Sequence, residues 1–231
     1  MPDIIDVEKL AATYFADVSS KLRQLNKSSS ENIVPTLAIV RTGKVKYEDI
    51  ALVDHLEQAK EFGFDIRLIT LNGTSHNDVE NVIEELSDDY SIDGIVLQVG
   101  MEETKNMQEI FENITPCKDV AGVTSANVAN VLEGKSTNSV LPCVPSSCMQ
   151  IIHQFTGNPS YLKGKRALVL MKCKTFGNQM AALLVQNQCI TTIYQPSTDD
   201  VQEMCGQADV LIVNVQNANF IKGHGFYVFL L

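Results

Sequence analysis

The sequence lacks tryptophan, long apolar runs and an excess of positive charge. Its 231 residues include 18 lysines and arginines against 28 aspartates and glutamates, which gives a formal net charge of −10. Because an acidic chain without a basic stripe repels phosphate backbones, we expect no nucleic-acid partner. No apolar stretch approaches the roughly 18 residues that predict a membrane-spanning helix, so we expect no membrane partner either.

Targeting and metal-binding patterns are missing too. The first residues, MPDIIDVE, are acidic, unlike a signal peptide or an arginine-rich transit peptide, so we expect a cytoplasmic protein and leave the mitochondrion open. The 6 cysteines form no C-x-x-C pair and no cluster with histidines. This spacing is poor for zinc and too sparse for a disulfide framework, so we expect reduced thiols and no metal site.

What the sequence does contain is a regular alternation of strand and helix patterns. Strand-like runs cover 36–40, 66–70, 94–99, 166–171, 190–194 and 210–213. Amphipathic helical patterns cover 5–25, 47–62, 77–87, 146–156, 177–187 and 200–206. Strands that alternate with helices favour parallel sheets covered on both faces, so the sequence predicts an α/β fold.

The alternation breaks between 114 and 145, where Pro116, Pro142 and Pro145 interrupt the pattern. We therefore expect two α/β units with a boundary near 145–160. The second unit has about three strands and then ends on the apolar run HGFYVFLL. Because so short a parallel sheet leaves an apolar face or edge uncovered, we expect a truncated chain or one that needs a partner surface.

Three residues of the first 148 are candidates for chemistry. His55 lies four residues after Ala51 on the expected helix 47–62, and its ordinary pKa near ~6.5 suits acid–base chemistry, although a lone helical histidine is more often structural. Gln98 closes a strand at the carboxyl edge, where open α/β sheets bind ligands. Cys143 has no basic neighbour in the sequence, so we expect a buried and inert thiol there.

The loop at 171–177 follows a strand and opens a helix, as a dinucleotide-binding loop does. It reads MKCKTFG, with one glycine where the fingerprint needs more. Lys172 and Lys174 attract phosphate by charge but form no cradle. By itself this loop is a weak dinucleotide signal.

Seven short segments carry a family resemblance, and they lie at 37–40, 92–98, 118–124, 141–145, 162–165, 208–213 and 220–223. In this order and at these separations they resemble the methylenetetrahydrofolate dehydrogenase/methenyltetrahydrofolate cyclohydrolase family. The resemblance runs from about residue 3 to residue 223. It implies an N-terminal α/β domain that binds the folate substrate (1–148) and a truncated Rossmann-like domain that binds NAD(P) (149–231).

The resemblance also assigns catalytic positions, and most of them depart from the family pattern. It places Ala51 and His55 where the family has a catalytic tyrosine and lysine, and Gln98 where a glutamine orients that lysine. The family string KDVDG reads KDVAG at 118–122, so Ala121 replaces the aspartate that holds the pteridine. Asp119 matches the first aspartate of the string, which is not the folate ligand.

Two further groups of binding residues follow from the same resemblance. It implies that Pro142 and Cys143 contact folate, and that Lys172, Cys173 and Gly177 contact NAD(P). The family loop GRSxxVGxP reads MKCKTFGNQ at 171–179, so a methionine stands at the first glycine and the proline is absent.

The lead hypothesis is a degenerate family member with weak or lost activity. The resemblance implies that an active member transfers a hydride from methylenetetrahydrofolate to NAD(P) and then adds water to the methenyl bridge. Two alternatives stay open: residual cyclohydrolase or dehydrogenase activity that uses His55 and Gln98, and a non-enzymatic subunit that pairs with an intact paralogue. Because the family commonly dimerises through its Rossmann domain, the resemblance implies a homodimer or heterodimer.

Overall fold

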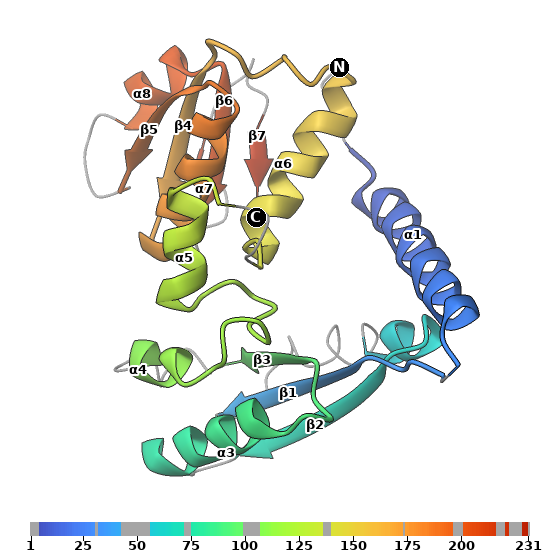
Figure 1. The fold of residues 1–231 in the computed structure, drawn as a ribbon. Helices are drawn as coiled ribbons and strands as arrows, with labels where there is room; N and C mark the ends of the chain where they lie inside the picture. Colours follow the sequence, from blue (N-terminus) through green and yellow to red (C-terminus); the bar gives the residue numbers. More distant parts are fainter. Residues whose placement is uncertain are drawn as a thin grey trace. The chain divides into compact units, whose positions relative to one another are not determined.

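The chain folds into two compact units, residues 1–124 and 125–231, and each is built on its own parallel sheet (Figure 1). The predicted α/β class is confirmed. The computed structural model describes residues 5–30, 32–42, 56–71, 75–98, 107–135, 140–172, 174–195, 201–215, 220–221 and 228–230. Of the expected helix 47–62, the described part at 56–61 is helical, whereas Ala51 and His55 lie outside the described residues.

The first unit carries a three-stranded sheet in the order β2-β1-β3, with parallel pairing throughout. Its elements are α1 (Val7–Ser28), β1 (Thr36–Thr42), β2 (Asp65–Leu71), α3 (His76–Asp88), β3 (Gly94–Gln98) and α4 (Met107–Glu112). The central strand β1 has no exposed residue, while the outer strand β2 exposes residues on both faces. Burial of β1 on both faces accounts for the continuous apolar run in its sequence.

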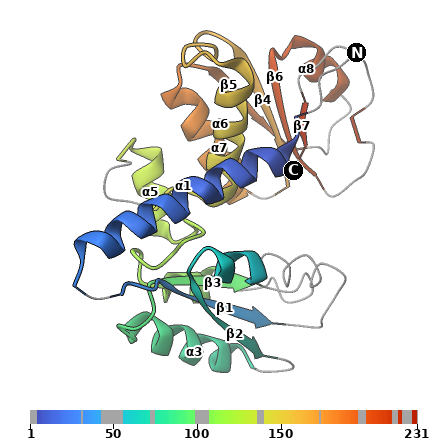
Figure 2. The ribbon, with the colours of Figure 1, turned by 90° about the vertical axis from the view of Figure 1, so that its right-hand side faces the viewer.

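Helix α3 begins with a capping box that the sequence encodes locally. The Ser75 hydroxyl accepts a hydrogen bond from the Asp78 backbone N–H at 3.3 Å, and the Asp78 carboxylate accepts one from the Ser75 N–H at 2.9 Å. From this start, Val79, Ile83 and Leu86 face the sheet and pack into the core of the first unit. Figure 2 shows α3 along one face of the sheet.

The second unit carries a four-stranded sheet in the order β5-β4-β6-β7, again with all pairs parallel. Its elements are α5 (Ser125–Leu132), α6 (Cys143–Thr156), β4 (Arg166–Met171), α7 (Lys174–Gln186), β5 (Ile190–Tyr194), α8 (Val201–Gln207), β6 (Val210–Asn214) and β7 (Val228–Leu230). The expectation of about three strands with an uncovered apolar edge is wrong for this sheet, because residues 228–230 add a fourth strand beside β6. They form β7, and Val228 pairs with Leu211.

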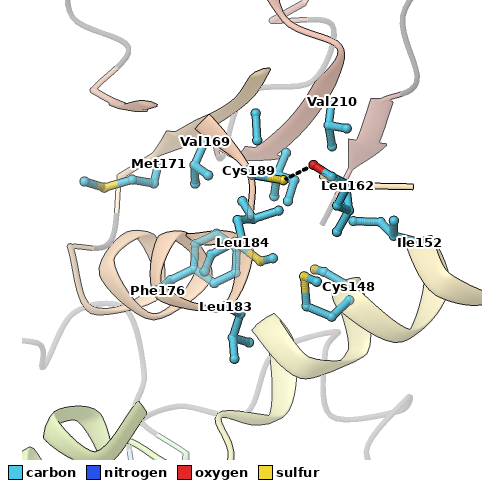
Figure 3. Packing of buried hydrophobic residues seen from close by; sticks show 14 of the residues in the cluster. Cys148, Ile152, Leu162, Val169, Met171, Phe176, Leu183, Leu184, Cys189 and Val210 are labelled. Atoms are coloured by element: carbon cyan, nitrogen blue, oxygen red, sulfur yellow. Dashed lines mark hydrogen bonds between the residues drawn. The ribbon is translucent and has the colours of Figure 1, made fainter. Parts of the chain in front are cut away.

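Strand β4 divides the core of the second unit into two clusters by the alternation of its side chains. Ala167, Val169 and Met171 pack towards α6 and α7, in the larger cluster that Figure 3 shows from close by. Leu168 and Leu170 pack on the other face, in a cluster that includes Cys205 of α8. Both faces of the sheet are therefore covered, as in other parallel sheets.

Three helices differ from the sequence prediction. Helix α6 begins at Cys143 rather than 146, since Pro145 falls in its first turn, where the missing N–H would have had no helical partner in any case. Helix α7 begins at Lys174 rather than about 177. Helix α5 was not predicted, and it packs against α7, where the Gln186 side-chain amide donates to the Val131 carbonyl at 2.6 Å.

The chain divides into its two compact units between residues 124 and 125. Helices α5 and α6 belong to the second unit because both pack against α7. The division of the sequence into domains at 148/149 stays a prediction.

No helix in the described part of the chain is long and apolar enough to cross a membrane. Across the same residues, no three His, Cys, Asp or Glu side chains gather where they could hold a metal ion. The five described cysteines are free thiols, two of them exposed and three buried.

Candidate functional site

Gln98 lies at the carboxyl edge of the first sheet, where parallel strands leave a ligand-binding edge. It is the last residue of β3, it pairs in register with Arg41 of β1, and it is exposed. The side-chain amide can therefore donate to and accept from a ligand or a base. His55, the expected proton-transfer residue, lies outside the described residues, so the pairing of His55 with Gln98 stays a prediction.

A loop at 115–124 runs beside β3 and is tied to it by the backbone. The Ile95 N–H donates to the Lys118 carbonyl at 2.7 Å, and Ile95 and Asp119 form an isolated parallel bridge. The Lys118 ammonium donates to the carbonyls of Ser87 at 2.6 Å and Asp89 at 2.8 Å. One lysine therefore fastens this loop to the carboxyl end of α3, where unpaired helix carbonyls attract a cation.

The Asp119 carboxylate organises the turn that follows. The residue is fully buried, and its two oxygens accept hydrogen bonds from the backbone N–H groups of Gly122 at 2.9 Å and Thr124 at 2.8 Å. Gly122 adopts φ +68°, a left-handed conformation that favours glycine. Half-buried Ala121 lies within this turn and contributes a methyl group.

Pro142 and Cys143, the expected folate contacts, belong to the second unit, whereas Gln98 and Ala121 belong to the first. Pro142 is buried as the N-cap of α6, and Cys143 is the first residue of that helix. The expectation of a buried Cys143 thiol is wrong, because the residue is exposed. The buried face of α6 is set by Pro145, Cys148, Met149 and Ile152, and Cys143 falls outside their helical spacing.

The β4–α7 turn holds the residues expected to contact the cofactor. Lys172 is exposed, and its backbone N–H donates to the Asn214 carbonyl at 3.2 Å. Cys173 lies outside the described residues. Gly177 is buried in the first turns of α7, and a Cβ atom on it would lie 2.6 Å from Cγ of Met171.

This turn does not fit the phosphates of a dinucleotide. A Rossmann loop brings backbone close to the pyrophosphate, and glycines keep that space open. Here the Met171 side chain fills the space above Gly177 and is only 5% exposed. We therefore derive no reaction step through NAD(P).

The buried thiols of the second unit have no features of nucleophiles. Burial raises the pKa of Cys148 from 9.0 to about 11, and it raises the pKa of Cys189 to about 11 as well. The Cys189 thiol also donates to the Leu162 carbonyl at 3.2 Å (Figure 3). Because only a thiolate is reactive, these groups belong to the core.

Two family models match successive parts of the chain. Residues 5–121 match the catalytic domain of tetrahydrofolate dehydrogenase/cyclohydrolase, and residues 142–226 match its NAD(P)-binding domain. The chain belongs to this family. The predicted membership in a family of folate one-carbon metabolism is thus confirmed, and the second unit is identified as its Rossmann-like domain.

Relatives of the tetrahydrofolate dehydrogenase/cyclohydrolase family match along almost the whole chain. "Bifunctional protein FolD 1" from Acinetobacter baylyi is 28% identical over 228 residues, which are 96% of this chain and 72% of that protein. "Bifunctional protein FolD 2" from Pseudomonas savastanoi pv. phaseolicola is 30% identical over 219 residues, which are 94% of this chain and 70% of that protein.

Solved structures of the same family share the fold. The methylenetetrahydrofolate dehydrogenase-cyclohydrolase of Trypanosoma brucei, solved with NADP and an inhibitor, superposes with a TM-score of 0.88 at 19% identity and covers 99% of this chain and 78% of that one. A 5,10-methylenetetrahydrofolate dehydrogenase from the silkworm Bombyx mori gives a TM-score of 0.84 at 21% identity, with 100% and 82% covered.

Sequence reasoning missed two features of these sites. Lys118 was known only as part of the KDVAG string, and its contacts with the carboxyl end of α3 involve residues about 30 positions away. The contact between Met171 and Gly177 was missed as well. The available signal was the methionine at the first glycine position of the family loop, but its contact with Gly177 forms only when β4 and α7 meet in the fold.

Proposed function

We propose that this member of the family has weak or lost methylenetetrahydrofolate dehydrogenase and methenyltetrahydrofolate cyclohydrolase activity. The observation that supports this most strongly is the 119–124 turn. Both carboxylate oxygens of Asp119 accept hydrogen bonds from the backbone N–H groups of the turn. Ala121 supplies only a methyl group where the family string has a second aspartate. Losing a charged hydrogen bond to the substrate costs about 1.5–3 kcal/mol, roughly 10- to 160-fold in affinity.

The proton-transfer group is altered as well. A histidine, His55, stands at the position of the family lysine, and an alanine stands at the tyrosine position. An imidazole is shorter than a lysine side chain and, with an ordinary pKa near ~6.5, is mostly neutral at pH 7. Because a positioned acid–base group contributes ~10²–10⁴-fold in rate, this replacement alone supports a large loss.

The two activities of the family provide the test. The purified chain would be assayed for NAD(P)-dependent oxidation of methylenetetrahydrofolate and, separately, for hydrolysis of methenyltetrahydrofolate, beside FolD 1 of A. baylyi as the active standard. We expect both rates to fall at least 100-fold below the standard. Rates within tenfold of it would contradict the proposal.

A rescue variant makes the same test sharper. Ala51→Tyr, His55→Lys and Ala121→Asp together return the family residues to the first unit, and we expect them to raise methenyltetrahydrofolate hydrolysis at least tenfold. His76→Lys is the matched control, since it adds a lysine to a helix outside the proposed site. If the triple variant folds and gains nothing over that control, the lost activity has another cause.

Residual activity is the second candidate, and the exposed position of Gln98 at the carboxyl edge of the sheet favours it. Under this hypothesis His55 transfers the proton and Gln98 orients the His55 side chain. The simplest case is the cyclohydrolase step, which needs no dinucleotide. Replacing His55 by alanine then abolishes hydrolysis, while His76→Ala leaves it unchanged. An equal rate in all three proteins would exclude this role.

An interaction subunit is a further candidate. Strand β5 lies at one end of the strand order in the second sheet, and it exposes Ile190 (62%) and Ile193 (38%). An exposed apolar strand at a sheet edge is a pairing surface for a second chain, here an intact paralogue or a second copy. Mass measurement by light scattering would show a dimer that Ile193→Lys dissociates; a monomer, alone and with the paralogue, would contradict this candidate.

A further inference from the structure

We propose that Met171 closes the dinucleotide site of the second unit, and that Gly177 receives the Met171 side chain instead of a phosphate. This inference deepens the proposed function and rests on it for the identity of the site. It assigns the loss of cofactor binding to one side chain, which makes the loss reversible by substitution.

Met171 lies at the carboxyl end of β4, next to the start of α7. It is the last residue of the strand, on the same face as Ala167 and Val169, and that face packs against α7. Helix α7 begins three residues later at Lys174, which places Gly177 at the start of its second turn. The strand end and the helix start are thus brought together, with the Met171 side chain against Gly177; Figure 3 shows Met171 beside α7.

The distances show that Met171 occupies the space that the glycine leaves. A Cβ atom on Gly177 would lie 2.6 Å from Cγ of Met171 and 3.1 Å from both its Sδ and its Cε. Carbon atoms in contact normally lie about 3.5–4.0 Å apart, so there is no room for even one methyl group. The side chain therefore lies directly against the backbone of Gly177.

The surroundings keep this side chain in place. Met171 is 5% exposed and Phe176, the residue before the glycine, is 7% exposed, and both belong to the larger core cluster of the second unit. An entering phosphate would have to displace a buried thioether from an apolar core. Lys172 and Lys174 remain exposed at the turn, and their charges give only a weak, salt-dependent attraction for anions.

NADPH binding measured by calorimetry without folate tests the closure. We expect the wild-type chain to bind NADPH with a dissociation constant above 1 mM at physiological salt, and Met171→Gly to bind it at least tenfold more tightly. Met180→Ala is the matched control, since it removes another buried methionine of the same cluster and leaves the turn unchanged. Micromolar binding by the wild type, or no gain in a folded Met171→Gly variant, would overturn the proposal.

A thermal-stability cycle tests the contact itself and covers the case in which Met171→Gly does not fold. Gly177→Ala lowers the melting temperature of the wild type, because its new methyl group meets Met171. In a Met171→Ala background the same substitution has a much smaller effect, since the colliding atoms are gone. An equal drop in both backgrounds, or no drop in the wild type, would overturn the proposal.

These results separate this inference from the proposed function. A chain that binds NADPH tightly but turns over no folate would refute the closure alone. A chain that hydrolyses methenyltetrahydrofolate at the standard rate without binding NADPH would refute the proposed loss of activity alone.

Discussion

Asp119 and Ala121 lie two residues apart in the KDVAG string and differ in what they contribute to the turn. Asp119 is fully buried and satisfies two backbone N–H groups, so its loss would leave buried donors without partners. Ala121 makes no such contribution to the turn through its methyl group. The fold therefore constrains the first position, whereas the turn itself makes no such demand on the second.

Replacing Asp119 by alanine is expected to lower the free energy of unfolding by about 2–4 kcal/mol, since the N–H groups of Gly122 and Thr124 lose their acceptor. Urea denaturation measures this loss. Asp88→Ala, an exposed aspartate at the end of α3, is the control and should change stability by less than about 0.5 kcal/mol. Equal effects of the two substitutions would contradict a structural role for Asp119.

The buried thiols of the second unit predict a pH dependence of stability. The pKa of both Cys148 and Cys189 rises from 9.0 to about 11 in the folded state. Above pH 9 the unfolded chain releases these protons while the folded chain keeps them, so their contribution is complete below pH 9 and is lost as the pH rises towards 11. We expect the free energy of unfolding to fall over that window.

Urea unfolding between pH 8 and pH 11 checks this, with the Cys148→Ala/Cys189→Ala variant as the comparison. The double variant should show a flatter fall than the wild type, because the other titrating groups are common to both proteins. Parallel curves would mean that the two thiols ionise in the folded chain as easily as in the unfolded one.

Helix α3 shows how an element depends on residues outside it. Its N-terminus is capped by Ser75 from the adjacent sequence, whereas its C-terminus carries no basic residue in the last turn. The cation that satisfies the carbonyls there is Lys118, which reaches back from the loop beside β3. One end of the helix is thus readable from local sequence, and the other depends on the tertiary fold.

Replacing Lys118 by methionine keeps the length of the side chain but removes the donor. We expect a loss of about 1–3 kcal/mol in the free energy of unfolding, with faster hydrogen exchange confined to the last turn of α3, such as the amide of Asp89. Lys163→Met, at an exposed lysine of the second unit, is the control. Unchanged exchange at Asp89 would show that Lys118 does not hold this end of the helix.

For the molecule as a whole, the first unit matches the family's catalytic domain and the second its NAD(P)-binding domain, and our proposals assign one altered site to each. In the first unit, the proposed change is an alanine at position 121 within an intact turn. In the second, it is a buried Met171 side chain that lies against Gly177. Changes of these two kinds differ in what reverses them, since the first needs an added group and the second needs a group removed.

A thermal melt with 5-formyltetrahydrofolate examines the first unit within the full chain. A ligand at about 100 times its dissociation constant adds roughly 2.7 kcal/mol of stability. We expect a small upward shift for the wild type and a larger one for Ala121→Asp, which restores the carboxylate. Ala129→Asp adds the same group on the exposed side of α5 and should match the wild type. No difference between the two variants would mean that position 121 does not contact the folate.

The alternation of strand and helix patterns was sufficient to predict the α/β class and most element positions, because buried strands and amphipathic helices carry their periodicity locally. The same is true of the family, whose short segments keep their order along the chain. Local patterns did not predict helix α5 or the strand at residues 228–230. Packing against α7 stabilises α5, and pairing with β6 stabilises the strand.

The positions and exposure of the site residues depend on contacts between residues that are far apart in the sequence or that lie on different elements. The periodicity of the sequence does not predict that the Lys118 ammonium binds carbonyls at the end of α3. Nor does it predict that Met171, at the end of β4, packs against Gly177 of α7. Likewise, the exposure of Cys143 followed from which face of α6 packs on α7. Chain order and fold class are encoded in local patterns, whereas the space open to a ligand is decided by close packing, which only the tertiary structure contains.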